Sequence, residues 1–207
     1  MSLADSDRLE ARRQQVLDAA AECFHKSGFH GASMAQIAKT AGISPGHIYN
    51  LFENKEDVIG MIVEREQAEL LAKVDAMQRA DDVVQAMLDQ VACGVESQLA
   101  GSDTALRMEI LAEAGRNPKL AMVVRNADVQ GREKLGSLLG AALAQRNLYR
   151  EPEEVQARVE VLMALFDGLM LRSLRNPTID RETVAPVVAR VVAMLIDRQV
   201  PGNDEPA

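Results

Sequence analysis

The sequence is poor in aromatic residues: its 207 residues include four phenylalanines, two tyrosines and no tryptophan. An aromatic cage around a flat cation is therefore not indicated. The chain has two cysteines, Cys23 and Cys93, too few for the disulfide framework of a small secreted protein. We expect both thiols to be buried and unreactive, because each falls among apolar neighbours in a predicted helix.

Long apolar runs are also missing. No stretch approaches the roughly 18 uncharged apolar residues of a membrane-spanning helix, and the N-terminal stretch MSLADSDRLEARRQQ lacks the apolar core of an export signal. The sequence therefore predicts a globular protein in the reducing cytoplasm, without a membrane partner. It contains no phosphate-binding loop, dinucleotide fingerprint or serine nucleophile motif, which argues against the common enzyme classes, and no metal or cofactor is expected.

Helical periodicity runs through nearly the whole chain, and no strand pattern competes with it. Turn signals such as Gly28, Asn117-Pro118 and Asn176-Pro177 separate the helical segments. The sequence thus predicts an all-α fold. The expected helices are Leu9–Ser27, Lys55–Met77, Asp82–Leu99, Asp103–Gly115, Pro118–Gln145, Glu153–Arg175 and Glu182–Arg198, with two short helices that begin at Met34 and Pro45.

The stretch Ser33–Phe52, called the recognition unit below, has the features of two short helices joined by a tight turn. Ser33 and Gln36 form a capping-box pattern at the start of the first helix. Gly42 can adopt the left-handed conformation that ends this helix. Ser44 followed by Pro45 suits the start of the second helix, where no backbone donor is needed.

The second helix of the recognition unit has an apolar and a polar side. Ile48, Leu51 and Phe52 fall at helical spacing, and we expect them to pack on the first helix. This arrangement is that of a helix-turn-helix, whose second helix enters the major groove of DNA. The residues left facing outward are Gly46, His47, Tyr49 and Asn50.

The region from Arg12 to Ile62 resembles the DNA-binding domain of TetR-family transcriptional regulators. Two positions depart from the family pattern, because Pro45 stands between Ser44 and Gly46, and Leu51 occupies a site often held by Tyr or His. The matching elements are Gly28-Phe29, Ser33-Met34, Ile37-Ala38, Ala41-Gly42-Ile43-Ser44, Gly46-His47-Ile48-Tyr49, Phe52 and Lys55-Glu56.

The resemblance implies two domains. Residues 1–54 would form an N-terminal three-helix, helix-turn-helix DNA-binding domain, and residues 55–207 a larger helical domain for effector binding and dimerisation, joined to it by a connecting helix. The implied protein is a homodimer that binds a palindromic operator in double-stranded DNA. A small-molecule effector would release it, and repression is the default of the family.

The outward residues have expected roles on DNA. Gly46, after Pro45, lets the backbone approach the duplex, and the ring of His47 can donate to or accept from a base edge. The hydroxyl of Tyr49 could reach a phosphate, and Asn50 could contact either a base edge or the backbone. The alternative is a surface position without a DNA contact for Gly46 and His47, and a packing role alone for Tyr49.

Lys55 stands at a helix start, where the helix dipole disfavours a cation, so its position is unfavourable for stability. A phosphate would explain it, and the matching family position contacts phosphate. Ser33, Thr40 and Ser44 are further phosphate candidates, although helix capping alone accounts for Ser33 and Ser44.

The net charge of -8 does not suggest a polyanion ligand, but its distribution is uneven. Residues 1–55 contain six basic and six acidic residues, so the remaining 17 basic and 25 acidic residues carry the whole net charge of -8. Binding to phosphate requires a local basic face rather than a basic chain. The contrast is compatible with DNA binding by the N-terminal part.

Two C-terminal helices are apolar over most of their circumference, within Val155–Leu174 and Val184–Ile196. Such helices must be buried on several sides. We expect them to form a four-helix bundle across a two-fold axis, as in the resembled family, although both could be central in a monomer. The expected interface residues are Phe166, Leu169, Leu174, Val188, Val191 and Leu195.

The effector site is less defined by sequence. Glu109 and Glu113 share a helical face, which we expect to be solvated. Asp167 has apolar neighbours on its face, so we expect it to be buried with a structural partner such as Arg172 or Arg175, in preference to a cationic effector. Four methionines could line an adaptable apolar pocket, with core filling as the alternative: Met108, Met122, Met163 and Met170.

Two other protein classes have weaker support in the sequence than a regulator. A carboxylate-bridged di-metal bundle needs two E-x-x-H motifs, and only Glu22-x-x-His25 is present. A helical protein-interaction adaptor would leave the outward residues of the recognition unit without DNA. The sequence therefore favours a DNA-binding regulator over an enzyme or an adaptor.

Overall fold

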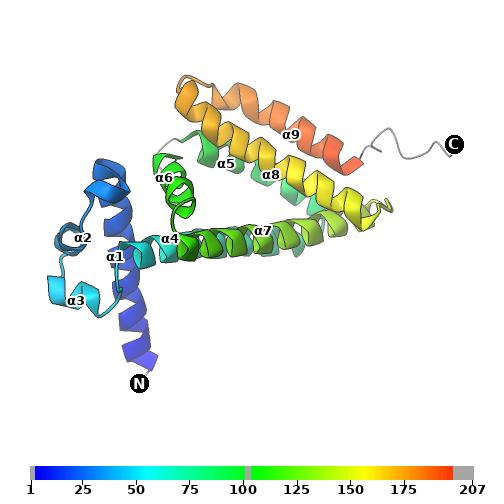
Figure 1. The fold of residues 1–207 in the computed structure, drawn as a ribbon. Coiled ribbons are helices and arrows are strands. Elements are labelled where there is room, and N and C mark those ends of the chain that lie inside the picture. Colours follow the sequence, from blue (N-terminus) through cyan, green and yellow to red (C-terminus); the bar gives the residue numbers. More distant parts are fainter. Residues whose placement is uncertain (1–2, 101–103, 198–207) are drawn as a thin grey trace. The chain divides into compact units, whose positions relative to one another are not determined.

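The computed structural model describes residues 3–100 and 104–197 (Figure 1). No strand occurs within these ranges, so the expected all-α fold is confirmed. The helices are α1 (Leu3–Gly31), α2 (Met34–Thr40), α3 (Pro45–Tyr49), α4 (Lys55–Gln78), α5 (Val83–Leu99), α6 (Thr104–Ala114), α7 (Pro118–Gln145), α8 (Pro152–Arg175) and α9 (Arg181–Asp197).

The largest difference from the expected boundaries is at the start of α1, which begins at Leu3 rather than Leu9. The apolar periodicity starts only at Leu9, and the mostly polar residues before it, SLADSDR, carry no helical pattern of apolar residues. The expected helix limits at Asp103 and Arg198 lie outside the described residues.

The chain divides into two compact units, one of Met1–Glu69 with Ser102–Val129 and one of Leu70–Gly101 with Gln130–Ala207. Helices α4 and α7 each contribute residues to both. This division is not the contiguous one expected from the sequence, because α6 and the first part of α7 pack with the N-terminal helices. A functional boundary between residues 54 and 55 stays a prediction.

The core of the first unit joins all the helices that hold the recognition unit. The inward side of α1 contributes Val16, Ala20, Cys23 and Phe24, which are all buried. Gly28 has a φ of 71°, so α1 bends there, where the sequence predicts its end. Buried side chains from the other elements complete this core: Ile37, Ile48, Phe52, Val58, Ile59, Ile62, Leu106, Ile110 and Leu120.

The second unit has its own core, built from α5, α8 and α9 together with the parts of α4 and α7 that belong to it. Gly94 on α5 lies against the ring of Phe166 on α8, where a β-carbon would be 2.8 Å from the ring.

Cys93, on the same helix, is exposed, so the expectation that both thiols are buried is wrong for Cys93. No helix among the described residues is long and apolar enough to cross a membrane.

Candidate nucleic-acid interface

The first helix of the recognition unit begins and ends where the sequence predicts. The hydroxyl of Ser33 accepts a hydrogen bond from the backbone N–H of Gln36 at 3.2 Å and so caps α2. Beyond its end, Gly42 has a φ of 64°, in the left-handed region. The N–H of Ile43 bonds back to the carbonyl of Ala38 at 3.0 Å, so the backbone itself closes the turn.

Two side chains of α1 contact the residues at the end of α2. The amide of Gln15 donates to the carbonyl of Ala41 at 2.8 Å, which satisfies a carbonyl at the end of α2. The sulfur of Cys23 lies 3.4 Å from the hydroxyl oxygen of Thr40. Sequence reasoning did not find Gln15, because a polar residue on the exposed side of a helix carries no distinguishing pattern.

The second helix, α3, is short and begins with the expected cap. The hydroxyl of Ser44 accepts from the N–H of His47 at 3.3 Å, and Pro45 occupies the first turn. Ile48 and Phe52 are buried in the first core, which fixes the rotation of α3 about its axis. The capping roles of Ser33 and Ser44 are confirmed, and their contact with phosphate stays a prediction.

The opposite side of α3 is free of internal packing. Pro45, Gly46, His47, Tyr49 and Asn50 are all exposed. A β-carbon built at Gly46 would meet nothing within 4 Å. The outward placement of these residues is therefore confirmed, and the side of α3 that they form can approach a large ligand without a change in the protein.

Lys55 has partners within the protein. Its ammonium donates to the carbonyls of Phe29 at 2.7 Å and Ala32 at 2.8 Å, and it lies 4.7 Å from the centroid of the Phe29 ring. These contacts with the end of α1 offset its unfavourable position at the start of α4. Its contact with phosphate stays a prediction.

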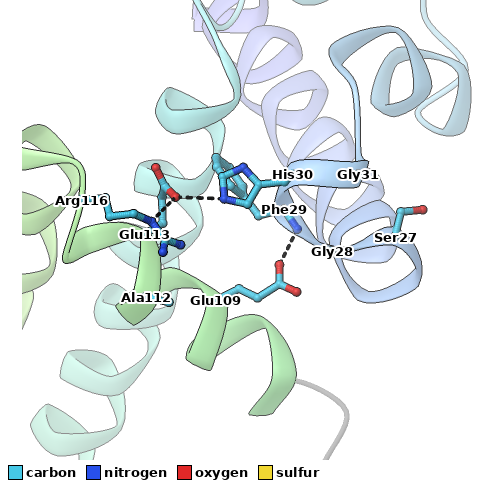
Figure 2. A pocket seen from close by; sticks show the side chains of 9 residues that line it. All are labelled: Ser27, Gly28, Phe29, His30, Gly31, Glu109, Ala112, Glu113 and Arg116. Atoms are coloured by element: carbon cyan, nitrogen blue, oxygen red, sulfur yellow. Dashed lines mark hydrogen bonds and ion pairs between the residues drawn. The ribbon is translucent and has the colours of Figure 1, made fainter.

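A pocket of about 200 Å³ lies between the end of α1 and α6 within the first unit, lined by Ser27, Gly28, Phe29, His30, Gly31, Glu109, Ala112, Glu113 and Arg116 (Figure 2). Glu109 accepts a hydrogen bond from the backbone N–H of Phe29. Glu113 lies 3.4 Å from the imidazole of His30 and 3.7 Å from the guanidinium of Arg116. The two carboxylates thus hold the end of α1 against α6.

These contacts overturn the expectation that Glu109 and Glu113 form a solvated face. Glu113 is only 9% exposed. Four-residue spacing shows that two carboxylates share a side of a helix, but not whether another helix covers that side. No signal in the sequence identifies the end of α1 as the partner of α6, because Glu109 binds a backbone N–H, which every residue except proline possesses, and His30 is 83 positions from Glu113 in the chain.

The methionines expected at an effector pocket belong to different compact units. Met108 and Met122 lie in the first unit, and Met163 and Met170 in the second. Met122 is 59% exposed, whereas Met170 is buried in the core of its unit. None of the four lines the pocket of Figure 2, and their role in effector binding stays a prediction.

The residues expected at a dimer interface differ in exposure. Leu174 is 51% exposed, whereas Val188 is 4% exposed within the single chain, where it fills the core of the second unit. Phe166 packs partly against Gly94, as described above. Leu169, Val191 and Leu195 are half-buried. Three further apolar side chains of α8 and α9 are exposed, namely Val161, Val187 and Met194.

The structure also places two acidic residues that the sequence singled out, and the expectation for Asp167 is wrong. Asp167 is exposed on α8 rather than buried, because Val159, Met170 and Ser173 occupy the inward side of that helix. Glu22, of the single E-x-x-H motif, forms an ion pair with Lys26 on the surface of α1. Among the described residues, no group of three or more His, Cys, Asp or Glu side chains is arranged to hold a metal ion.

This fold and the capped helix pair define the chain as a helix-turn-helix protein. Residues 16–60 match the family of bacterial regulatory proteins of the tetR type, and residues 76–197 match the C-terminal region of BetI-type transcriptional repressors. The chain belongs to the TetR family of bacterial regulatory proteins. The family points to regulation rather than to catalysis.

Relatives and solved structures agree with this assignment. The HTH-type transcriptional regulator UidR of Escherichia coli K12 is 35% identical over 126 residues, which cover 60% of this chain and 63% of UidR. BetI of Escherichia coli is 29% identical over 172 residues, which cover 78% of this chain and 82% of BetI. Salmonella enterica GusR has the same fold with a TM-score of 0.72 at 24% identity, over 91% of this chain and 96% of GusR.

Proposed function

We propose that the protein is a cytoplasmic homodimeric repressor that binds a palindromic operator and is released from it by a small-molecule effector. The observation that carries this proposal is the division of α3 into two sides. Ile48 is buried, while Pro45, Gly46, His47 and Tyr49 are exposed next to one another. In a helix-turn-helix, the N-terminal part of the second helix is the part that lies nearest the bases.

The side chains of this face suggest a division of tasks. His47 is the best candidate to read a base edge, because its ring can donate or accept and its side chain is exposed. Tyr49, with an exposed hydroxyl, is placed to bind a phosphate, and Asn50 to bind either kind of group. Further proposed phosphate contacts are Ser33 at the start of α2, Thr40 at its end and Ser44 at the start of α3.

Dimerisation would present two copies of α3 to DNA. Helices α8 and α9 expose apolar side chains that a second chain could cover, among them Leu174, Val161, Val187 and Met194. Leu169, Val191 and Leu195 are half-buried and would contribute their remaining surface. A dimer fits a palindrome when its recognition helices are about 34 to 36 Å apart, one turn of DNA.

A selection of binding sites from random double-stranded DNA tests the proposal. We expect enrichment of a palindrome whose half-sites are read by α3. The matched control is the double variant His47→Ala, Tyr49→Ala, which changes only exposed side chains and should enrich the palindrome weakly or not at all. If the wild-type protein enriches no sequence, DNA recognition is refuted and a helical protein-interaction adaptor becomes the better interpretation.

The proposal includes a small-molecule effector that binds among the apolar helices. FadR of Bacillus subtilis was solved in complex with stearoyl-CoA, and this chain shares its fold with a TM-score of 0.70. For this chain we propose an effector that contacts the apolar helices of the second unit, with Met163 and Met170 as candidate contacts. Met108 is left out because it belongs to the first unit. Met122 is left out because most of its surface is exposed in the chain.

To release the protein from DNA, the effector must bind the released state more tightly than the DNA-bound state. A near-complete switch needs a preference of about 5.5 kcal/mol for the released state. Helix α4 is the proposed link, because it contributes residues to both compact units. Calorimetric titration of a ligand found by thermal-shift screening should show weaker binding with operator DNA than without it, and equal affinities would rule out the coupling.

A further inference from the structure

We propose that the pocket of Figure 2 is a binding site for a small organic cation with N–H groups, such as an alkyl diamine, which the carboxylates of Glu109 and Glu113 would bind. The pocket lies within the first unit, at the end of α1, whereas the effector proposed above contacts the second unit. Binding at this pocket requires neither DNA nor a second chain, so its test is independent of the proposed function.

The carboxylate of Glu113 is buried without a full set of hydrogen bonds. Glu113 is 9% exposed, and its Oε2 atom has no hydrogen-bond donor within the part of the chain that the structure describes. His30 and Arg116 lie within ion-pair distance of this atom, but their side chains are mostly exposed, at 74% and 65%. Burial of a carboxylate is unfavourable unless it is both paired and hydrogen-bonded. An N–H group of a ligand would supply the missing bond.

Glu109 supplies a second carboxylate to the same pocket, one helical turn before Glu113 on α6. Its Oε2 atom accepts from the backbone N–H of Phe29. An ionised carboxylate has about four acceptor positions, so capacity for a ligand remains. Gly28 leaves the other oxygen uncrowded, because a β-carbon at that position would be 3.1 Å from Oε1. The backbone of α1 and the side chains of α6 therefore form two walls of the site.

The charge of the pocket favours a cation. Its lining residues include two carboxylates, one guanidinium and one imidazole, so one positive and two negative charges give a net charge of -1 while His30 is neutral. Lys55, on α4, donates to the carbonyls of Phe29 and His30 but does not line the pocket. An anion would meet both carboxylates, whereas a cation can pair with them.

The size and lining of the pocket restrict the cation further. Its volume of about 200 Å³ is below the roughly 300 to 1,000 Å³ of sites for drug-sized ligands, so it suits a molecule of a few non-hydrogen atoms. A quaternary ammonium is usually held by aromatic faces. The ring of Phe29 already lies 4.7 Å from the ammonium of Lys55, which leaves the carboxylates to bind the ligand. A diamine with N–H donors at both ends can pair with both of them.

The probe for this site is diaminobutane with an amino group at each end, which is a dication at neutral pH because its amines resemble that of lysine. Two comparison compounds separate its properties. Butanediol has the same length without charge, and tetramethylammonium has charge without N–H groups. Binding is measured by isothermal titration calorimetry at constant ionic strength, and the site is located by NMR shifts of the backbone amides of Phe29 and Glu113.

Three variants test the residues, with circular dichroism to show that each is folded. Glu113→Gln keeps the shape of the side chain and removes its charge. Arg116→Met removes the guanidinium that competes for Glu113 and changes a mostly exposed side chain. Glu22→Gln is the matched control, because Glu22 is an exposed carboxylate of α1 that does not line the pocket.

We expect diaminobutane to bind the wild-type protein with a dissociation constant of about 1 mM or below. Glu113→Gln should weaken binding at least about tenfold, because the buried charge that pairs with the ligand is lost. Arg116→Met should strengthen binding severalfold, and Glu22→Gln should leave it unchanged. Butanediol and tetramethylammonium should bind more weakly than the diamine or not at all.

Three results would overturn the proposal. The first is absence of diamine binding at about 20 mM to both the wild type and Arg116→Met. The second is equal weakening by Glu113→Gln and Glu22→Gln, which would show attraction to the acidic surface alone. The third is equal binding of tetramethylammonium or butanediol, which would remove the need for a charged N–H donor. Arg116→Met keeps the test decisive if Glu113→Gln does not fold.

Discussion

The backbone N–H of Phe29 donates a hydrogen bond to the carboxylate of Glu109, which lies 80 positions further along the chain (Figure 2). The carbonyl of the same residue accepts from Lys55. Residues of α6 and α4 therefore hold one backbone segment at the end of α1. This segment leads into α2, so the start of the recognition unit depends on two helices that lie outside it.

Removal of the carboxylate of Glu109 should weaken the first unit. Glu109→Ala leaves the N–H of Phe29 without its partner, and Phe29 is only 3% exposed. An unsatisfied buried donor costs about 1 to 3 kcal/mol. Urea unfolding should show this loss, whereas Glu109→Gln should lose less because its amide oxygen still accepts. Leu111→Ala is the control on the same helix: its side chain is half-exposed, and a loss as large as that of Glu109→Ala would contradict the assignment.

Two glycines of the recognition unit should respond in opposite ways to alanine. A β-carbon meets nothing within 4 Å at either Gly42 or Gly46, but only Gly42 has a positive φ, of 64°. Gly42→Ala should therefore cost about 1 to 2 kcal/mol of unfolding free energy through backbone strain alone. Gly46→Ala should not destabilise the protein but should weaken operator binding, because the added methyl group keeps α3 from the duplex. Thermal unfolding and gel-shift titration measure the two effects, and equal unfolding temperatures for both variants would contradict this account.

His47→Ala should change which operator sequences the protein prefers. The imidazole of His47 could contact one base in each half-site, and a good base contact contributes about 1 to 3 kcal/mol of discrimination against the wrong base. Site selection with the variant should relax one position of each half-site and keep the rest. His25→Ala removes an exposed histidine from α1 and serves as the control. A uniform loss of affinity for all duplexes would assign His47 to a phosphate instead.

A charge at Leu174 should prevent dimerisation. The side chain is 51% exposed on α8 in the single chain, so Leu174→Glu should not disturb the core of its unit. Burial of an unpaired carboxylate between two chains is strongly unfavourable. Size-exclusion chromatography with light scattering at micromolar concentration should show a dimer for the wild type and a monomer for the variant. Tyr149→Ser removes an exposed aromatic ring elsewhere in the second unit and should remain dimeric. A wild-type monomer would refute the dimer itself.

The pair Asp75–Lys134 should make stability depend on pH at the acidic end. The hydrogen bond from Lys134 is the main cause that lowers the pKa of Asp75 below its usual 3.8. A carboxyl whose pKa is lower in the folded state stabilises the fold above its unfolded pKa, and this contribution is lost as the pH falls through the folded value. The difference in unfolding free energy between wild type and Asp75→Asn should therefore be constant above pH 3.8 and shrink below it. In a Lys134→Met background the same difference should show no such decline.

Much of the recognition unit could be predicted because its determinants are local. Ser33, Gly42, Ser44 and Pro45 each act on backbone groups within a few residues, and the structure has them in those roles. Ile48 and Phe52 follow from helical spacing alone, since the buried side of a short helix is fixed by its apolar residues. The outward placement of His47 and Tyr49 then has no alternative.

The sequence by itself determined the all-α fold, most helix limits and the outward side of α3, because caps, turns and apolar periods act over one or two helical turns. Only the tertiary structure decided the partners of Lys55, Glu109 and Glu113, and the exposure of Cys93 and Asp167. Those contacts join residues far apart in sequence, often to backbone amides or carbonyls that every residue possesses. Such partners leave no mark in the sequence, and only the packing of helices selects them.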